Sequence, residues 1–191
     1  GLTESAMRDR VDDFYQLFPQ IKLSFRTNFP GIQLNLYSLG IDEEDVNMQM
    51  EAASQWIHRK LGNKIISDID ESIEKVVGNL LVRKQAHLAV AESCTGGLIA
   101  DLLTNVPGSS DYFVFSAVTY SNQLKMKILG VTTETLDRYG AVSEQTAQEM
   151  AVGIRTNAAT DIGISTTGIA GPTGGTAEKP VGLVYIGIAS Q

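Results

Sequence analysis

The sequence predicts an α/β protein in two parts: a three-layer α/β/α domain at residues 76–191, preceded by a small α+β domain at residues 1–75. After about residue 75, helical and strand-like segments alternate, which is typical of a sheet with helices on both faces. Before it, two segments that alternate strictly between apolar and polar residues favour a hairpin. With 43% hydrophobic and 19% charged residues, the 191-residue chain is large enough for two cores.

The first part begins with a helical pattern of apolar side chains that Pro19 ends. The two alternating strands follow, with a turn at residues 28–31 between them, and the next helix ends at Gly62. The expected elements are helices at 4–18 and 42–61 and strands at 21–26, 32–37 and 64–67.

The second part carries clear helix boundaries, with Gly130 after one helix and Ser143 as the N-cap of the next. In sheets of this kind, ligands bind at the loops beyond the carboxyl ends of the strands. Glycine-rich turns occupy two such ends, at residues 93–97 and 167–175. The expected elements are helices at 72–84, 95–103, 122–129 and 143–157 and strands at 87–92, 112–120, 161–166 and 182–189.

The first glycine-rich turn holds three adjacent candidate nucleophiles, Ser93, Cys94 and Thr95, followed by Gly96 and Gly97. A helix N-terminus attracts anions because its first N–H groups lack partners. We therefore expect the N–H groups of residues 94–97, or of Gly168, Ile169, Ala170 and Gly171 in the second turn, to bind an oxyanion or a phosphate. The alternatives are an ordinary N-cap cluster with Cys94 as a packing residue, and a second turn that is a mere connector.

A serine nucleophile needs a base, and no histidine is well placed to serve. His87 begins the strand that leads to Ser93, roughly 16 Å away at the rise of an extended strand. Tyr120 and Lys125 follow the next strand, and a lysine that is removed from water loses its proton more readily. A Ser-Lys-Tyr group would be an acyl-transfer site, although Lys125 also fits a solvated helix face.

Charge, apolar runs and cysteine content exclude several classes of function. A net charge of −7 disfavours nonspecific binding to nucleic acid, and no apolar run is long enough to span a membrane. The single cysteine fits a reducing compartment, and no zinc-ligand spacing occurs. Without a recognisable signal peptide, we expect a cytoplasmic protein that uses no metal or cofactor.

Five motifs in order resemble the C-terminal domain of the CinA (competence/damage-inducible protein) family. They are Ala91–Gly97 (AESCTGG), Val118–Asn122 (VTYSN), Gly140–Ser143 (GAVS), Thr167–Gly175 (TGIAGPTGG) and Lys179–Gly182 (KPVG). The resemblance implies hydrolysis of nicotinamide mononucleotide to nicotinate mononucleotide and ammonia, without metal or cofactor. It also implies Ser93 as nucleophile, Tyr120 and Lys125 as proton-transfer partners, Thr167 as an assisting group, and a homodimer.

Residues 1–75 resemble, more loosely, the KH-like domain that precedes the amidase domain in this family. Family members also carry a larger N-terminal domain and continue with a further strand and a long helix, so we expect this chain to be a fragment. Residues 1–75 lack the Gly-x-x-Gly loop with which KH domains clamp nucleic acid. The alternative to an amidase is a non-catalytic nucleotide-binding or regulatory module.

Overall fold

The computed structural model describes residues 3–28, 31–40 and 42–190. The chain forms two compact units whose boundary lies between Ile73 and Glu74, close to the division expected near residue 75. Each unit contains its own hydrophobic core, so each is described by itself. Within the described ranges, every helix is too short or too polar to cross a lipid bilayer.

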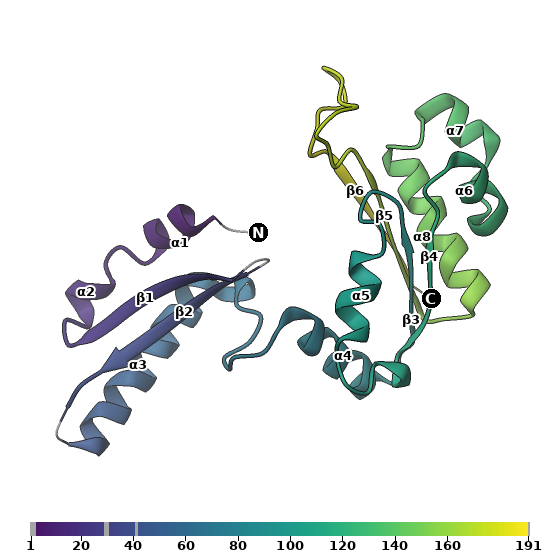
Figure 1. Ribbon diagram of the computed structural model, residues 1–191. Coiled ribbons are helices and arrows are strands. Elements are labelled where there is room, and N and C mark those ends of the chain that lie inside the picture. The colour runs from purple at the N-terminus through teal and green to yellow at the C-terminus, as the bar shows by residue number, and fades with distance from the viewer. Residues whose placement is uncertain (1–2, 29–30, 41, 191) are drawn as a thin grey trace. The chain divides into compact units, whose positions relative to one another are not determined.

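The first unit packs helices against an antiparallel pair of strands (Figure 1). The strands pair in register from Ile21 opposite Ser38 to Asn28 opposite Gly31, which confirms the two expected strands. Residues 29 and 30 of the expected turn lie outside the described residues. The elements are α1 (Glu4–Arg10), α2 (Phe14–Leu17), β1 (Ile21–Asn28), β2 (Gly31–Ser38), α3 (Glu43–Leu61) and the 3-10 turn η1 (Gly62–Lys64).

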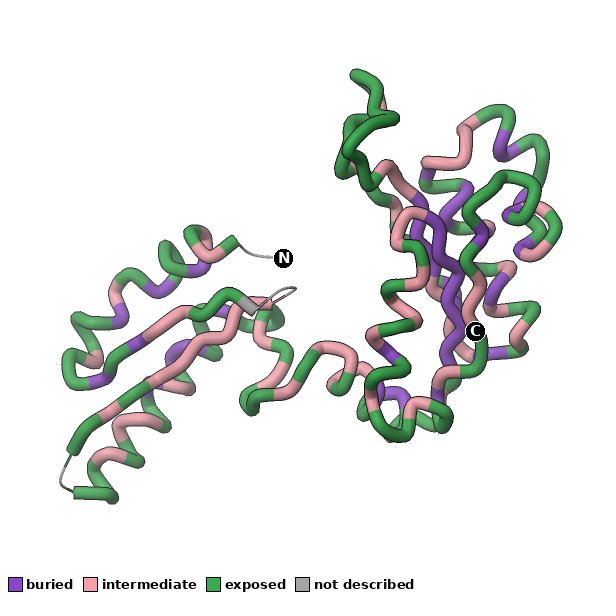
Figure 2. Tube along the Cα trace, viewed as in Figure 1, coloured by how far each residue is buried: buried purple, intermediate pink, exposed green. Residues whose placement is uncertain are grey.

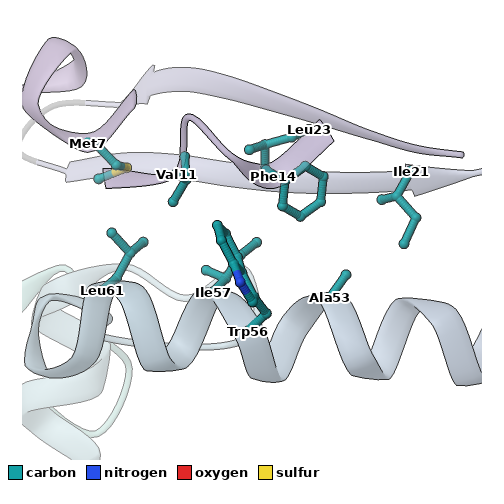
Figure 3. Close-up of a cluster of buried hydrophobic side chains, with 9 residues drawn as sticks. All are labelled: Met7, Val11, Phe14, Ile21, Leu23, Ala53, Trp56, Ile57 and Leu61. Carbon is teal, nitrogen blue, oxygen red and sulfur yellow. The ribbon is translucent and has the colours of Figure 1, made fainter. Parts of the chain in front are cut away.

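The core of this unit lies between α3 and the segment that runs from α1 into β1. Figure 3 shows Trp56 and Ile57 of α3 facing Phe14 and Ile21. The rings of Phe14 and Trp56 meet edge to face with their centroids 5.7 Å apart, a favoured aromatic geometry. This apolar layer explains the helical and strand periodicities of residues 4–61.

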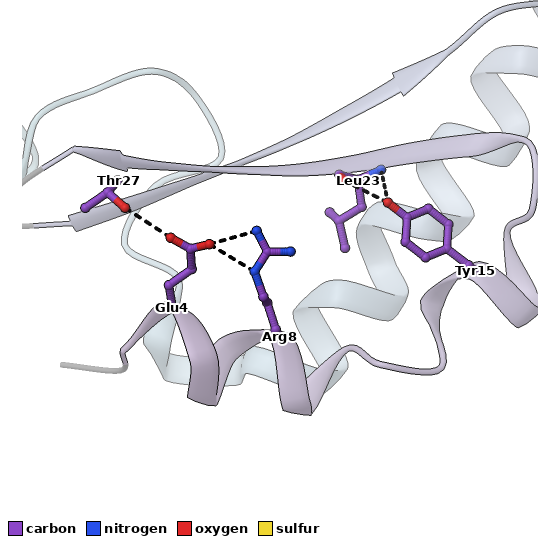
Figure 4. Close-up of polar contacts among 5 residues, drawn as sticks. All are labelled: Glu4, Arg8, Tyr15, Leu23 and Thr27. Atoms are coloured by element: carbon purple, nitrogen blue, oxygen red, sulfur yellow. Dashed lines mark hydrogen bonds and ion pairs between the residues drawn. The ribbon is translucent and has the colours of Figure 1, made fainter.

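The single helix expected over residues 4–18 is wrong, because the chain forms two short helices, α1 and α2. The N–H of Val11 bonds to the carbonyl of Arg8, so the α-helical ladder stops there. The break lets the Tyr15 hydroxyl reach β1, where it donates to the carbonyl of Leu23 at 2.9 Å and accepts from its N–H at 3.3 Å (Figure 4). Tertiary contact with the sheet has overridden local helix propensity.

The strand expected at residues 64–67 is also wrong. Gly62 has a positive φ of 55°, and the chain turns there into η1. Among the described residues, the only strands of this unit are β1 and β2. The segment that follows η1 is irregular as far as α4.

The second unit is a four-stranded sheet with the order β4-β3-β5-β6. β3 is parallel to both of its neighbours, and β6 is antiparallel to β5. The elements are α4 (Ile73–Lys84), β3 (Leu88–Glu92), α5 (Leu98–Thr104), η2 (Ser109–Asp111), β4 (Phe113–Val118), α6 (Asn122–Leu129), α7 (Thr133–Tyr139), α8 (Glu144–Ala158), β5 (Ile162–Gly168) and β6 (Val184–Ser190).

Helices cover both faces of this sheet, which confirms the three-layer α/β/α prediction. β3 is buried along its whole length (Figure 2). Its residues alternate between two cores: Leu88 and Val90 pack with α4 and α5, whereas Ala89 and Ala91 pack with α6, α7 and α8. Adjacent residues of β3 therefore serve opposite layers of the unit.

α8 crosses the sheet closely because glycines lie under it. A Cβ at Gly163 of β5 would lie 2.3 Å from the carbonyl oxygen of Ala151, and one at Gly187 of β6 would lie 2.3 Å from that of Ala147. Both distances are shorter than real contacts, so these positions admit only glycine unless the helix moves outward.

The helix caps account for where sequence expectations and structure agree. The Ser121 and Ser143 hydroxyls accept backbone N–H groups at the starts of α6 and α8, as expected of N-cap residues. The helix expected from residue 95 begins only at Leu98, after a tight turn. α7 matches no expected element, since it is short and buries only Thr135 and Leu136.

Candidate functional site

Ser93 lies in the turn that links β3 to α5. Gly96 and Gly97 have φ values of 63° and 104°, in the left-handed region that glycine adopts readily. These two residues let the chain reverse direction directly after the strand. Ser93 is held at the strand end with only 8% of its surface exposed.

The side chain of Lys125 contacts Ser93 from α6, the helix that follows the neighbouring strand β4. Its Nζ lies 2.9 Å from the Ser93 Oγ, within hydrogen-bond reach. The amine also donates to the carbonyl of Thr119 at 2.7 Å and lies 3.4 Å from that of Tyr120. All three partners are uncharged oxygens, so the contacts orient the amine without supplying a counter-ion.

Burial lowers the pKa of Lys125 below its ordinary value of 10.5, because an ammonium loses its hydration there. The nearby Cys94 thiol, when ionised, opposes this shift. Lys125 is 1% exposed, which excludes the alternative of a solvated helix face. The lowered pKa favours the neutral amine, which is the form that can accept a proton from Ser93.

Glu92 is a component of the site that sequence reasoning missed. It is fully buried and accepts hydrogen bonds from the N–H groups of Gly97, Ile99 and Ala100 at 2.9 to 3.1 Å. The carboxylate thus caps α5 and closes the turn around Ser93. A charged residue at the end of an otherwise apolar strand was the available signal.

Hydroxyl side chains line the carboxyl ends of the neighbouring strands. The Thr95 and Thr166 hydroxyls lie 2.8 Å apart, and this contact ties the turn that carries Ser93 to β5. Thr167 is 1% exposed and donates to the carbonyl of Ala141 at 2.6 Å. Thr167 therefore holds the segment before α8 in place.

The side chains of Tyr120 and Cys94 fit a catalytic role less well than that of Lys125. Tyr120 is 74% exposed, and only its backbone carbonyl contacts the Lys125 amine. Burial raises the pKa of the Cys94 thiol, which makes its thiolate less available at neutral pH. Ser93 and Lys125 are the two expected catalytic side chains that the fold brings into contact.

The second glycine-rich loop runs from β5 to β6. The Ile169 N–H donates to the carbonyl of Leu183 at 2.9 Å, so this amide is not free to bind an anion. A Cβ at Gly168 would lie 2.5 Å from the same carbonyl oxygen, so glycine lets the two arms of the loop approach. The Lys179 ammonium donates to the carbonyl of Tyr139 at 2.8 Å and ties the loop to the end of α7.

Ala170 and Gly171 at the tip of that loop are exposed. In the part of the chain that the structure describes, no hydrogen bond joins residues 168–171 to Ser93 or Lys125. The expectation that these residues bind substrate stays a prediction.

Two of the backbone amides of residues 94–97 are occupied. The N–H of Gly96 donates to the carbonyl of Ser93, and that of Gly97 donates to Glu92, so neither amide is free to bind an anion in this structure. Among the described residues, no oxygen accepts from the N–H groups of Cys94 and Thr95. Both N–H groups stabilise the ionised form of the Cys94 thiol, and no other acceptor for them is present within the described ranges.

Possible metal ligands do not gather in the described ranges, where no group of three or more His, Cys, Asp or Glu side chains converges. The two histidines belong to different units: His58 contacts Asp68 in the first, and His87 contacts Asp161 in the second.

Comparison with known proteins identifies the family of the chain. A family model described as the CinA C-terminal domain matches residues 70–191. A CinA-like protein of Desulfosudis oleivorans is 49% identical over 189 residues, which are 99% of this chain and 46% of that protein. A putative competence-damage inducible protein of Clostridium perfringens is 48% identical over 188 residues, 98% of this chain and 45% of that protein. The chain thus spans slightly less than half the length of these relatives.

Solved structures agree with this result. A CinA superfamily protein from Escherichia coli is similar with a TM-score of 0.61 and 34% identity, over 69% of this chain and 79% of that chain. A competence/damage inducible protein from Agrobacterium tumefaciens gives a TM-score of 0.59 and 41% identity, over 65% of this chain and 78% of that chain. On the family match and these relatives, the chain belongs to the CinA family.

Proposed function

We propose that the chain is a serine amidase that hydrolyses the carboxamide of nicotinamide mononucleotide to nicotinate mononucleotide and ammonia. The observation that carries the proposal is the 2.9 Å contact between the Ser93 hydroxyl and the buried Lys125 amine. A serine with a neutral base in hydrogen-bond reach is the arrangement that nucleophilic catalysis requires. The nucleotide itself is taken from the resemblance of the motifs to the family amidase.

In the acylation step, the neutral Lys125 amine accepts the proton of Ser93 as Oγ bonds to the carboxamide carbon. The carbonyl electron pair moves onto oxygen and forms a tetrahedral oxyanion. When this intermediate collapses, the carbon–nitrogen bond breaks and the Lys125 ammonium returns its proton to the departing nitrogen. Ammonia leaves, and Ser93 carries the nicotinate mononucleotide as an ester.

In the deacylation step, Lys125 accepts a proton from a water molecule whose oxygen attacks the ester carbon. The carbon–Oγ bond then breaks, Ser93 regains a proton from Lys125, and nicotinate mononucleotide leaves. One neutral amine thus serves both half-reactions.

The N–H groups of Cys94 and Thr95 are the donors we assign to the oxyanion. They belong to the same turn as Ser93, which is the usual relation between a nucleophile and its oxyanion hole. Glu92 holds this turn through its three bonds to α5, so the donors are fixed before substrate arrives. The 5′-phosphate we assign to the loop of residues 167–175, whose tip is exposed.

The test is ammonia release from nicotinamide mononucleotide by the wild-type protein and by Ser93→Ala, with EDTA present. We expect release that withstands EDTA and is lost in the variant, while calorimetry shows that Ser93→Ala still binds the nucleotide. Cys94→Ala is the matched control in the same turn, and we expect it to retain turnover.

Two results would contradict the proposal in different ways. Loss of turnover in Cys94→Ala but not in Ser93→Ala would move the nucleophile to the thiol. Nucleotide binding without any ammonia release by the folded wild-type protein would favour the non-catalytic binding module instead.

A further inference from the structure

Thr119 presents a buried hydroxyl beside the Ser93–Lys125 pair that has no partner among the described residues. The residue is 1% exposed, and its Oγ1 makes no hydrogen bond within the described ranges. Its backbone is fully engaged, since its N–H donates to the carbonyl of Glu92 and its carbonyl accepts from Lys125. Leaving a buried hydroxyl without a partner is unfavourable, so the group is conspicuous.

The strand register shows which way this hydroxyl faces. Ala91 of β3 lies opposite Ala117 of β4, and both contact the core beneath α6, α7 and α8. Continuing the alternation past β4 puts Thr119 beside Ser93, on the face from which Lys125 arrives. The orphaned hydroxyl therefore belongs to the reaction site.

We propose that the Thr119 hydroxyl accepts an N–H of the substrate's carboxamide and so holds its nitrogen toward Lys125. This inference rests on the proposed function. A primary carboxamide has two N–H donors, which need acceptors once the substrate is desolvated. The oxyanion donors Cys94 and Thr95 cannot provide them, and Lys125 must give a proton to the nitrogen rather than orient it.

The same hydroxyl serves the second half-reaction. After ammonia has left, the attacking water occupies the place of the nitrogen and offers two O–H donors. Thr119 accepts one of them while Lys125 accepts the proton that is transferred. The hydroxyl rotates, so after deacylation it can instead donate to the carboxylate of the product.

The chain offers a matched control on β4, the strand that precedes Thr119. Ser116 of β4 also has a buried hydroxyl without a partner in the described ranges. It lies opposite Val90, so it faces the core beneath α4 and α5 rather than the reaction site. Thr119→Val and Ser116→Ala each remove an unpaired hydroxyl, but only the first removes one beside Lys125.

The experiment measures turnover, binding and stability in Thr119→Val, Thr119→Ser and Ser116→Ala. We expect Thr119→Val to lower kcat/KM about 10-fold to 100-fold, the range for one lost hydrogen bond to substrate. Its midpoint of urea unfolding should equal or exceed that of the wild type, because no native bond is lost. Thr119→Ser should restore turnover, and Ser116→Ala should leave it unchanged.

Binding gives a readout that does not need turnover. In the Ser93→Ala background, the dissociation constant of nicotinamide mononucleotide should rise when Thr119→Val is added, and should not rise with Ser116→Ala. If the wild type releases no ammonia but this dissociation constant behaves as expected, the amidase proposal fails and the Thr119 contact stands. If turnover is normal in Thr119→Val and the dissociation constant is unchanged, the contact is refuted and the amidase proposal stands.

Discussion

The buried carboxylate of Glu92 should stabilise the turn that carries Ser93, and its substitution tests this directly. In Glu92→Gln the amide oxygen can take the place of Oε2 and accept from Gly97 and Ile99. The amide nitrogen then faces the N–H of Ala100, which loses its acceptor. The variant therefore loses one charge-assisted bond, weakens two others and buries an unpaired NH₂ group.

These losses set the magnitude. A hydrogen bond to a charged group contributes about 1.5–3 kcal/mol, and a buried donor left without an acceptor costs about 1–3 kcal/mol. We expect Glu92→Gln to lower the free energy of unfolding of the second unit by roughly 3–5 kcal/mol, in the range for breaking a buried charged contact. Turnover should fall as well, because the turn that carries Ser93 loosens.

The assay has to report on the second unit. The single tryptophan, Trp56, lies in the core of the first unit, so its fluorescence does not follow the second. Far-UV circular dichroism in urea, together with hydrogen exchange at the amides of Gly97, Ile99 and Ala100, measures the change directly. Glu144→Gln is the matched control, an exposed glutamate in the first turn of α8, where we expect a loss below about 1 kcal/mol.

The reasoning is refuted if exchange at these three amides and the unfolding midpoint are both unchanged in Glu92→Gln. Equal losses in Glu92→Gln and Glu144→Gln would also refute it, since they would show a general effect of charge at helix starts.

Two further predictions concern the proton-transfer groups. Because burial lowers the pKa of Lys125 in the folded state, the unfolded chain binds more protons between that value and 10.5, and the free energy of unfolding should rise with pH in this interval. Lys125→Met, made in a Cys94→Ala background because the thiol and the amine are electrostatically coupled, should remove that rise in urea titrations. The comparison with Cys94→Ala alone cancels the opposite slope of Tyr112, whose pKa burial raises; equal slopes in both proteins would contradict the shift. Tyr120→Phe should change kcat far less than the roughly 100-fold or greater loss expected for a general base, because its exposed phenol does not contact the amine; a loss of that size would make the phenol the proton acceptor.

Sequence reasoning succeeded where the structure depends on local chemistry. The layers followed from the alternation of helices and strands, α6 followed from Gly130 at its end, and α8 followed from the N-cap Ser143. Local signals also located Ser93 and Lys125, because both follow strand ends of one sheet. α7 lacked such a signal, since a seven-residue helix with few buried side chains leaves little periodicity.

The features that the sequence did not predict depend on contacts between residues that are distant in the chain. The break between α1 and α2 is set by Tyr15 reaching β1, which no helical pattern in residues 4–18 reveals. The exposure of Tyr120 and the burial of Lys125 likewise follow from packing, because both residues fit a strand end or helix start equally well. The role of Glu92 appears only once the turn after it has closed.

The alternation of β3 explains how the Glu92 carboxylate and the Lys125 amine are both placed around Ser93. Glu92 points to the layer of α5, where three backbone N–H groups donate to its carboxylate, whereas Ser93 points to the layer of α6 and contacts Lys125. A carboxylate in contact with Lys125 would stabilise the ammonium and raise its pKa. Burial lowers the pKa of the Lys125 amine, and the ionised Cys94 thiol opposes that shift. The two neighbouring residues thus differ in their partners: Glu92 fixes the turn, and Ser93 contacts a buried lysine whose lowered pKa suits the base that we propose.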